Sequence, residues 1–266
     1  MRVNYIKKGV LLLKIFNMKK ITTLFLISLI VSCKSDPVLF ELTTSVNPVG
    51  YGIVSPNKGT VWLGDQIELS AEANTGYSFV KWSGDLNDSI SKVSLIFDSD
   101  KSVIAEFTEM TKVPDNIFEK YLIEIGVDDK IDGFVNTNKI KKITSLNISN
   151  KGVNDLTGIE DFITLKVLIA DNNLISNLDL NFNTELEILS LNNNSLKILD
   201  FTNNTNLKII YLNDNSFENL DLSLISNLIE FSAINNLMNC IKINNSQISS
   251  SSNWFKDAQT VFDTSC

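Results

Sequence analysis

Reactive side chains are few in this 266-residue sequence, and its three cysteines are the most informative of them. Cys33, Cys240 and Cys266 carry thiols that can be alkylated, oxidised or bound to a metal. The sequence contains no histidine, so a serine or cysteine nucleophile lacks its usual base and a metal lacks its commonest ligand. There is also no P-loop, glycine-rich dinucleotide turn or CxxC pair. We therefore expect no catalytic residues, no metal and no cofactor.

The first cysteine ends a segment with the layout of a secretory signal. Lys19 and Lys20 precede an apolar run over residues 21–31, which is too short to span a bilayer, and Ile30-Val31-Ser32-Cys33 follows. This tetrapeptide resembles the lipobox of bacterial lipoproteins. The resemblance implies that Cys33 receives a lipid, that the preceding peptide is removed, and that the chain is exported and held at the outer membrane. An uncleaved anchor or a chance cysteine is the alternative, and residues 1–17 are either an extended basic region or the product of a start assigned upstream of Met18.

The other two cysteines are then left as an even pair in an exported chain. Oxidising surroundings favour a disulfide between Cys240 and Cys266. Such a bond would fold the tail, residues 244–266, over the preceding repeat as a C-terminal cap. Two unrelated free thiols are the alternative.

A 21-residue repeat precedes these two cysteines and predicts the secondary structure that must position them. Leu165, Leu186, Leu207 and Leu228 each open a segment of the form LxxLxLxxNxLxxLDL. One such unit buries too little apolar surface to fold alone, so neighbouring units must stack. The pattern resembles the leucine-rich repeat family over residues 143–243. That resemblance implies a right-handed solenoid in which each coil places a strand on a concave face.

A column of amides accompanies the leucines. These side chains have donors and an acceptor for backbone groups where each coil bends inward. We therefore expect a structural asparagine ladder, formed by Asn173, Asn194, Asn215 and Asn236. Asn183 and Asn204 form a partial second column at the return turn, which Ile225 interrupts.

The outward positions of the concave strands are the candidate binding surface. Its aliphatic members and Tyr211 predict an exposed apolar strip with a polar border, as at many protein contacts. The expected ligand-binding residues are Val167, Ile169, Ile188, Ser190, Asn192, Ile209, Tyr211 and Asn213. Because β-branched residues suit strands whether or not they bind a partner, ordinary strand composition is the alternative.

Residues 34–38 read as a polar tether, and residues 39–110 alternate in short segments separated by turn residues, as strands do. Predicted strands cover residues 40–46, 52–55, 60–62, 66–73, 79–82, 92–97 and 102–107. The segments Gly76-Tyr77-Ser78-Phe79 and Trp82-Ser83-Gly84-Asp85 resemble the divergent internalin B-repeat family. The resemblance implies a small β-grasp-like module of extracellular bacterial proteins. We assign Phe79, Trp82 and Phe107 to its core rather than to a carbohydrate platform, because a module of this size needs large aromatics to build a core.

Residues 111–142 predict an N-terminal cap for the repeats. A helix with apolar spacing from Ile117 to Ile125 ends at Gly126. The following segment, residues 128–133, faintly suggests a calcium loop but lacks the remaining spaced ligands, so an ordinary polar turn is favoured. Asp179, Asp200 and Asp221 form a column that predicts turn capping rather than a row of cation ligands.

The charge of the chain narrows the choice of partner. Six of the 23 basic residues and none of the 31 acidic ones lie in residues 1–33, so 17 basic against 31 acidic residues leave a net charge of −14 on the rest. This charge argues against nucleic acid as a partner. The sequence predicts a multi-domain, β-rich envelope lipoprotein that binds a protein or glycan outside the cell and a membrane through its lipid. A structural envelope component without a ligand, or an accessory carbohydrate-capture lipoprotein, is the alternative.

Overall fold

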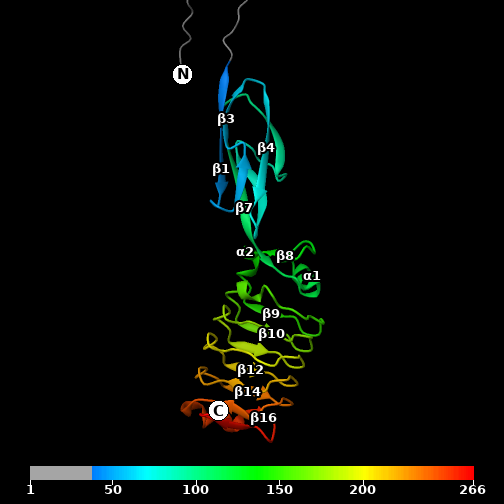
Figure 1. Ribbon diagram of the computed structural model, residues 1–266, viewed down its shortest axis with the longest axis vertical. Helices are drawn as coiled ribbons and strands as arrows, with labels where there is room; N and C mark the ends of the chain where they lie inside the picture. The colour runs from blue at the N-terminus through cyan, green and yellow to red at the C-terminus, as the bar shows by residue number, and fades with distance from the viewer. Residues whose placement is uncertain (1–37) are drawn as a thin grey trace, which may run out of the picture. The chain divides into compact units, whose positions relative to one another are not determined.

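The computed structural model describes residues 38–266 (Figure 1). The expected signal peptide, the lipidation site Cys33 and most of the tether lie outside the described residues. Two separate hydrophobic cores form within the described part. One belongs to a β-module that begins at Leu39, and the other runs through the cap and the repeats. The β-rich, two-part architecture expected from the sequence is confirmed.

The β-module consists of two sheets. The larger has the strand order β3-β1-β7-β5, and the smaller has the order β2-β4-β6. The strands are β1 (Leu39–Asn47), β2 (Gly52–Ser55), β3 (Lys58–Trp62), β4 (Gln66–Ala73), β5 (Tyr77–Gly84), β6 (Lys92–Ile96) and β7 (Lys101–Lys112). Every strand predicted for this segment is present. The longest extension beyond prediction is in β7, which continues to Lys112 because its last residues pair with β8 (Phe134–Asn136) of the cap.

Large aromatics fill this small core. Trp82 is fully buried, Phe107 is nearly so, and Phe79 packs against both with ring centroids 5.4 Å and 5.7 Å away. The Trp82 indole donates a hydrogen bond to the Ile90 carbonyl at 2.9 Å. Gly52 lies so close to the Phe107 ring that a Cβ atom there would come within 2.5 Å of it. The packing gives these aromatics a core role.

The cap connects the β-module to the repeats. It contains α1 (Asn116–Glu124) and α2 (Thr137–Ile140), and α1 ends before Gly126, which has φ +75°. Asp115 caps α1 by accepting from the N–H groups of Ile117 and Phe118, and its other oxygen accepts from Asn154 and Asp155 of the first coil. Burial opposes ionisation of Asp115, but the backbone donors outweigh it and hold its pKa below the usual value.

The repeats stack as a parallel solenoid. One face is a six-stranded sheet with the order β16-β14-β12-β11-β10-β9, and the other side carries a three-stranded sheet, β13-β15-β17. The strands are β9 (Ser145–Asn147), β10 (Val167–Ile169), β11 (Ile188–Ser190), β12 (Ile209–Tyr211), β13 (Leu220–Asp221), β14 (Glu230–Ala233), β15 (Cys240–Lys242), β16 (Phe255–Lys256) and β17 (Val261–Asp263). Short 3-10 turns occupy η1 (Ile159–Asp161), η2 (Asn245–Gln247) and η3 (Ser250–Asn253). The leucines that open each unit point inward and are buried, which confirms the expected solenoid.

The C-terminal tail covers the last repeat by continuing the coils. β16 pairs in parallel with β14, and β17 pairs in parallel with β15, so the tail extends both sheets by one strand. Trp254 and Phe262 pack on the Phe231 ring of the preceding coil, with centroids 5.8 Å and 6.2 Å away. The last repeat is therefore covered by a further coil with an aromatic interior.

Candidate binding surface

The outward side chains of the six-stranded sheet, called the strand face below, lie in two aligned columns. Ile188 pairs directly with Val167 and Ile209, and Ser190 pairs directly with Ile169 and Tyr211. Neighbouring strands of a sheet are about 4.8 Å apart. The structure thus brings the predicted apolar residues together on adjacent coils.

The exposure of these side chains differs from the expectation of a fully exposed strip. Val167, Ile169, Ile188, Ile209 and Tyr211 are half-buried, because each side chain shields its neighbours on the coils above and below. We call these five residues the apolar strip. Ser190 is buried, and its hydroxyl donates to Asp171 at 2.7 Å and accepts from the Asn192 amide at 3.1 Å. The hydroxyl group of Ser190 is therefore engaged in internal contacts.

Amide and carboxylate side chains border the strip on one side. Asn192 accepts from the backbone N–H of Asn213 at 2.9 Å, and Asn213 accepts from Ser232 and from the N–H of Ile234. These predicted ligand-binding residues support the backbone of the next coil. Their remaining polar surface borders the strip.

Charged side chains border the strip on the other side and at its end, where Glu230 pairs in register with Ile209. Glu187 pairs with Lys208 at 2.6 Å and with Lys166 at 3.3 Å, and the hydrogen bonds from these lysines lower the pKa of Glu187. The Tyr211 hydroxyl donates to Glu230 at 2.5 Å, and this bond, with burial, raises the pKa of Tyr211 to about 12. This border was not predicted, although Lys166, Glu187 and Lys208 follow the same 21-residue spacing.

The asparagine ladder connects adjacent coils. Asn215 donates from Nδ2 to the carbonyls of Leu191 and Leu212, at 2.9 Å and 3.2 Å, and accepts at Oδ1 from the N–H of Leu196 at 3.0 Å. The other three amides of the ladder make equivalent bonds, each to a carbonyl of the coil that precedes it. Each amide thus satisfies buried backbone groups on two coils, as a structural role requires.

Replacing Asn215 with alanine should lower the free energy of unfolding by about 1–3 kcal/mol, because the buried N–H of Leu196 would lose its acceptor. Urea denaturation monitored by circular dichroism measures this loss. Asn227→Ala, an exposed amide at the edge of the coils, serves as the control and should leave the midpoint unchanged. Equal midpoints for all three proteins would contradict the role of the ladder.

Two further polar columns support the coils. Asn183 and Asn204 donate to carbonyls of the preceding coil, and Gln247 does the same after the interruption at Ile225. Gln247 was not predicted as a member of this column because it lies 22 residues after Ile225 rather than 21. A further column, which was also not predicted, has a left-handed backbone conformation with positive φ. Its members directly precede those of the asparagine ladder and are Asn172, Asn193, Asp214 and Asn235.

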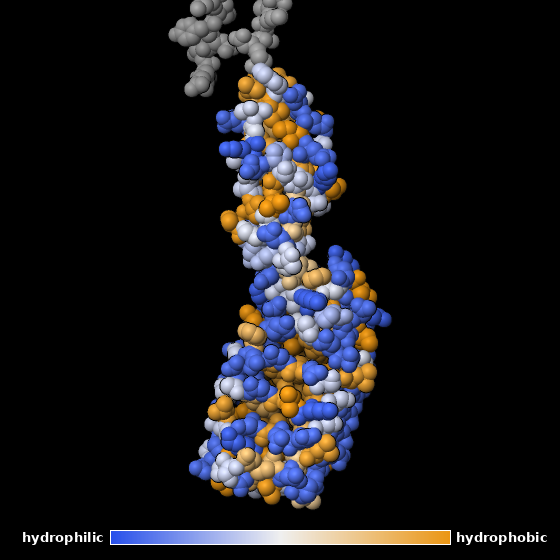
Figure 2. All heavy atoms as spheres, in the orientation of Figure 1, coloured by the Kyte–Doolittle hydropathy of each residue, from blue (hydrophilic) through white to orange (hydrophobic). Residues whose placement is uncertain are grey.

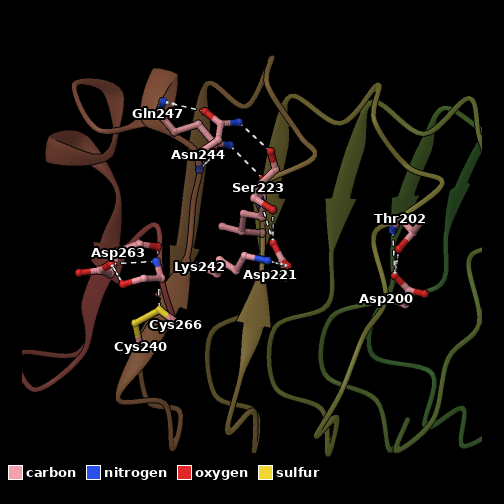
Figure 3. Close-up of polar contacts among 12 residues, drawn as sticks. Asp200, Thr202, Asp221, Ser223, Cys240, Lys242, Asn244, Gln247, Asp263 and Cys266 are labelled. Carbon is pink, nitrogen blue, oxygen red and sulfur yellow. Dashed lines mark hydrogen bonds and ion pairs between the residues drawn. A yellow bond between two sulfur atoms is a disulfide. The ribbon is translucent and has the colours of Figure 1, made fainter.

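The aspartate column caps turns, and Figure 3 shows the contacts of two of its members, Asp200 and Asp221. Asp200 accepts from both the N–H and the hydroxyl of Thr202, and Asp221 does so from Ser223. Lys242 follows Asp221 in the column and pairs with it at 2.8 Å. The hydrogen bonds from Thr202 hold the pKa of Asp200 below its usual value. The carboxylates of Asp200 and Asp221 are therefore engaged in capping turns.

The segment over residues 128–133, expected to be a polar turn rather than a calcium loop, is organised by a buried carboxylate. Glu119 accepts from the N–H groups of Asp132, Gly133 and Phe134, at 2.8 Å, 2.6 Å and 3.2 Å. These donors point toward Glu119, so the loop presents N–H groups to the carboxylate as a polar turn does. Within residues 38–266 no three acidic or cysteine side chains are placed together to hold a metal ion.

Asp128 of this loop should destabilise the fold at neutral pH. Burial is the main reason that its pKa is raised, and the charge of Glu119 contributes. A carboxyl with a raised pKa in the folded state favours folding below its unfolded value, about 3.9, and this contribution is lost as the pH rises through the folded value. Asp128→Asn should therefore raise the melting temperature at pH 7 and not at pH 3. The exposed neighbour Asp129→Asn is the control, and a lower melting temperature of Asp128→Asn at pH 7 would refute the assignment.

Cys240 and Cys266 form a disulfide, as shown in Figure 3. The bond joins β15 to the last residue of the sequence and closes the final coil. Within residues 38–266, no helix has the length and apolar content needed to cross a membrane.

Solved structures with a similar arrangement come from repeat proteins. They include an internalin, InlF, from Listeria monocytogenes (17% identity, TM-score 0.42, 56% of this chain and 58% of that chain) and the functional domain of InlJ from the same species (21%, 0.37, 52% and 38%). A third is the leucine-rich repeat ectodomain of the receptor kinase SOBIR1 from Arabidopsis thaliana (25%, 0.37, 44% and 71%). The chain thus spans less than two thirds of both internalin chains. A search of curated proteins gives no match.

The described residues form a β-module followed by stacked parallel coils with a 21-residue repeat. Residues 42–111 match the family model of the divergent InlB B-repeat domain. The resemblance expected from the sequence is confirmed for this domain, which is called the B-repeat domain below.

Proposed function

We propose that this protein is an exported, lipid-anchored envelope protein whose strand face binds a protein partner outside the cell. The observation that carries the binding proposal is the apolar strip, five half-buried side chains in register on three consecutive coils. A flat apolar strip with charged and amide borders has the anatomy of a protein interface. The proposed activity is binding without catalysis.

The disulfide supports the proposed location, since such bonds persist in oxidising compartments. The lipobox at Cys33 supplies the proposed anchor. Metabolic labelling with a fatty acid should label the wild type and not Cys33→Ser. Label retained by Cys33→Ser would refute the anchor.

The strip can be tested with a triple variant, Ile188→Thr, Ile209→Thr and Tyr211→Thr. Threonine keeps the strand preference of these positions while removing their apolar contacts. Protein spanning residues 34–266 would be used to capture partners from envelope extracts and host matrix. We expect the triple variant to lose the partner captured by the wild type.

A control variant separates binding from folding. Ile198 and Leu224 are exposed and lie outside the strand face, so Ile198→Thr and Leu224→Thr should leave capture intact. Unchanged capture by the triple variant would place the binding surface elsewhere. A captured species that is removed by glycosidase treatment would instead identify a glycan ligand, and no capture would favour a structural envelope role.

A further inference from the structure

We propose that the end of the B-repeat domain nearest Cys33 contacts the lipid interface of the membrane through Trp62 and the apolar residues beside it. This inference rests on the proposed lipidation of Cys33. It adds a second membrane contact made by the folded domain itself.

Apolar side chains gather where the described chain begins. Leu39 of β1 pairs directly with Trp62 of β3, and the N–H of Leu63 donates to the Val38 carbonyl at 3.0 Å. In the next turn, the N–H of Gly64 donates a hydrogen bond to the carbonyl of Phe97, just after β6, at 2.8 Å. Five large apolar residues of this region are exposed: Val38, Leu39, Trp62, Leu63 and Ile96. We call them the apolar tip, and Figure 2 shows apolar side chains at this end of the domain.

The core of the domain does not account for the apolar tip. That core is complete without it, because Leu42, Leu69, Trp82 and Phe97 are buried at 8% exposure or less. Several large apolar side chains left in water together mark a contact surface. We therefore expect the apolar tip to contact something outside the domain.

The length of the connecting chain identifies the occupant. Val38 is five residues after Cys33, and five extended residues span at most about 18 Å. A lipidated Cys33 lies at the membrane surface, so the tip is held within about 18 Å of that surface. Tryptophan is enriched at the membrane interface because its ring is largely apolar and its N–H is polar.

Charge at the same end decides which lipid chemistry the tip prefers. The turns over residues 63–66 and 97–101 carry Asp65, Asp98 and Asp100, whereas their one lysine, Lys101, is paired with Asp98 at 2.5 Å. Anionic lipids attract basic clusters, and these turns are acidic. The contact is therefore an apolar one with a zwitterionic interface.

Tryptophan fluorescence can test this contact directly. Of the three tryptophans in the sequence, Trp62 is 46% exposed, whereas Trp82 and Trp254 are 0% and 6% exposed. The lipidated full chain would be reconstituted in phosphatidylcholine vesicles with brominated acyl chains. We expect loss of emission relative to unbrominated vesicles, and this loss should be absent in Trp62→Phe. Leu39→Ser with Leu63→Ser should reduce the quenching without reducing vesicle flotation.

Each other outcome has a distinct meaning. Protein that floats with the vesicles but keeps its full emission would overturn the lipid contact and leave the anchor intact. Protein that fails to float would overturn the anchor and the contact together. Protection of Trp62 from acrylamide that rises with protein concentration in detergent would assign the tip to a second copy of the chain and overturn the lipid contact.

Discussion

Replacing Phe231 with alanine is expected to lower the free energy of unfolding by about 3–5 kcal/mol, the range for a buried aromatic ring. Phe231 is fully buried on β14, and its ring contacts those of Trp254 and Phe262 in the final coil. Its removal would leave a cavity between two coils that depend on each other for burial. Urea denaturation measures the loss.

A neighbouring aromatic provides the control for this variant. Phe255 lies on β16 in the next coil, but its side chain is exposed. Phe255→Ala should therefore change the stability far less than Phe231→Ala does. Similar effects of the two changes would mean that the final coil does not pack on its neighbour as described.

Removing the disulfide should have the second largest effect. Cys240 and Cys266 are 26 residues apart, and a closed loop of this length stabilises a fold by about 3.5 kcal/mol in the chain-entropy model. The double change Cys240→Ser and Cys266→Ser should lower stability by about that amount. Because Trp254 is buried in the final coil, its emission should shift to the red at lower urea concentrations than in the wild type.

Reduction of the wild type provides a check on this prediction. Dithiothreitol should reproduce the behaviour of the double variant, since both remove the same covalent bond. An unchanged urea midpoint after either treatment would show that the final coil is held by packing alone.

The coil architecture was predictable because each repeat position has a single environment. The leucines that open each unit, Leu165 to Leu228, are all buried at 4% exposure or less. A fixed spacing of apolar residues is a direct consequence of stacking, so it can be read from sequence. The strands of the B-repeat domain were predictable for a similar reason, because alternating exposure is visible along each segment.

Properties that depend on contacts between elements were not predictable. The length of β7 is set by pairing with β8, which follows it by more than 20 residues. The burial of Ser190 depends on Asp171 and on the side chains of adjacent coils. The tail was expected to cover the last repeat, but the sequence did not indicate that it does so as a further coil, because Gln247 departs from the 21-residue spacing. Such features need the three-dimensional positions of distant residues.

Photo-crosslinking at the strand face tests the central claim most directly. The claim is that the apolar strip is the surface that binds a partner outside the cell. A photoreactive phenylalanine analogue would be placed at Tyr211 on the strand face and, in a second protein, at Ile198, which is 75% exposed away from it. We predict a discrete crosslinked protein on intact cells from position 211 and none from position 198. A crosslinked protein from position 198 alone would contradict the account.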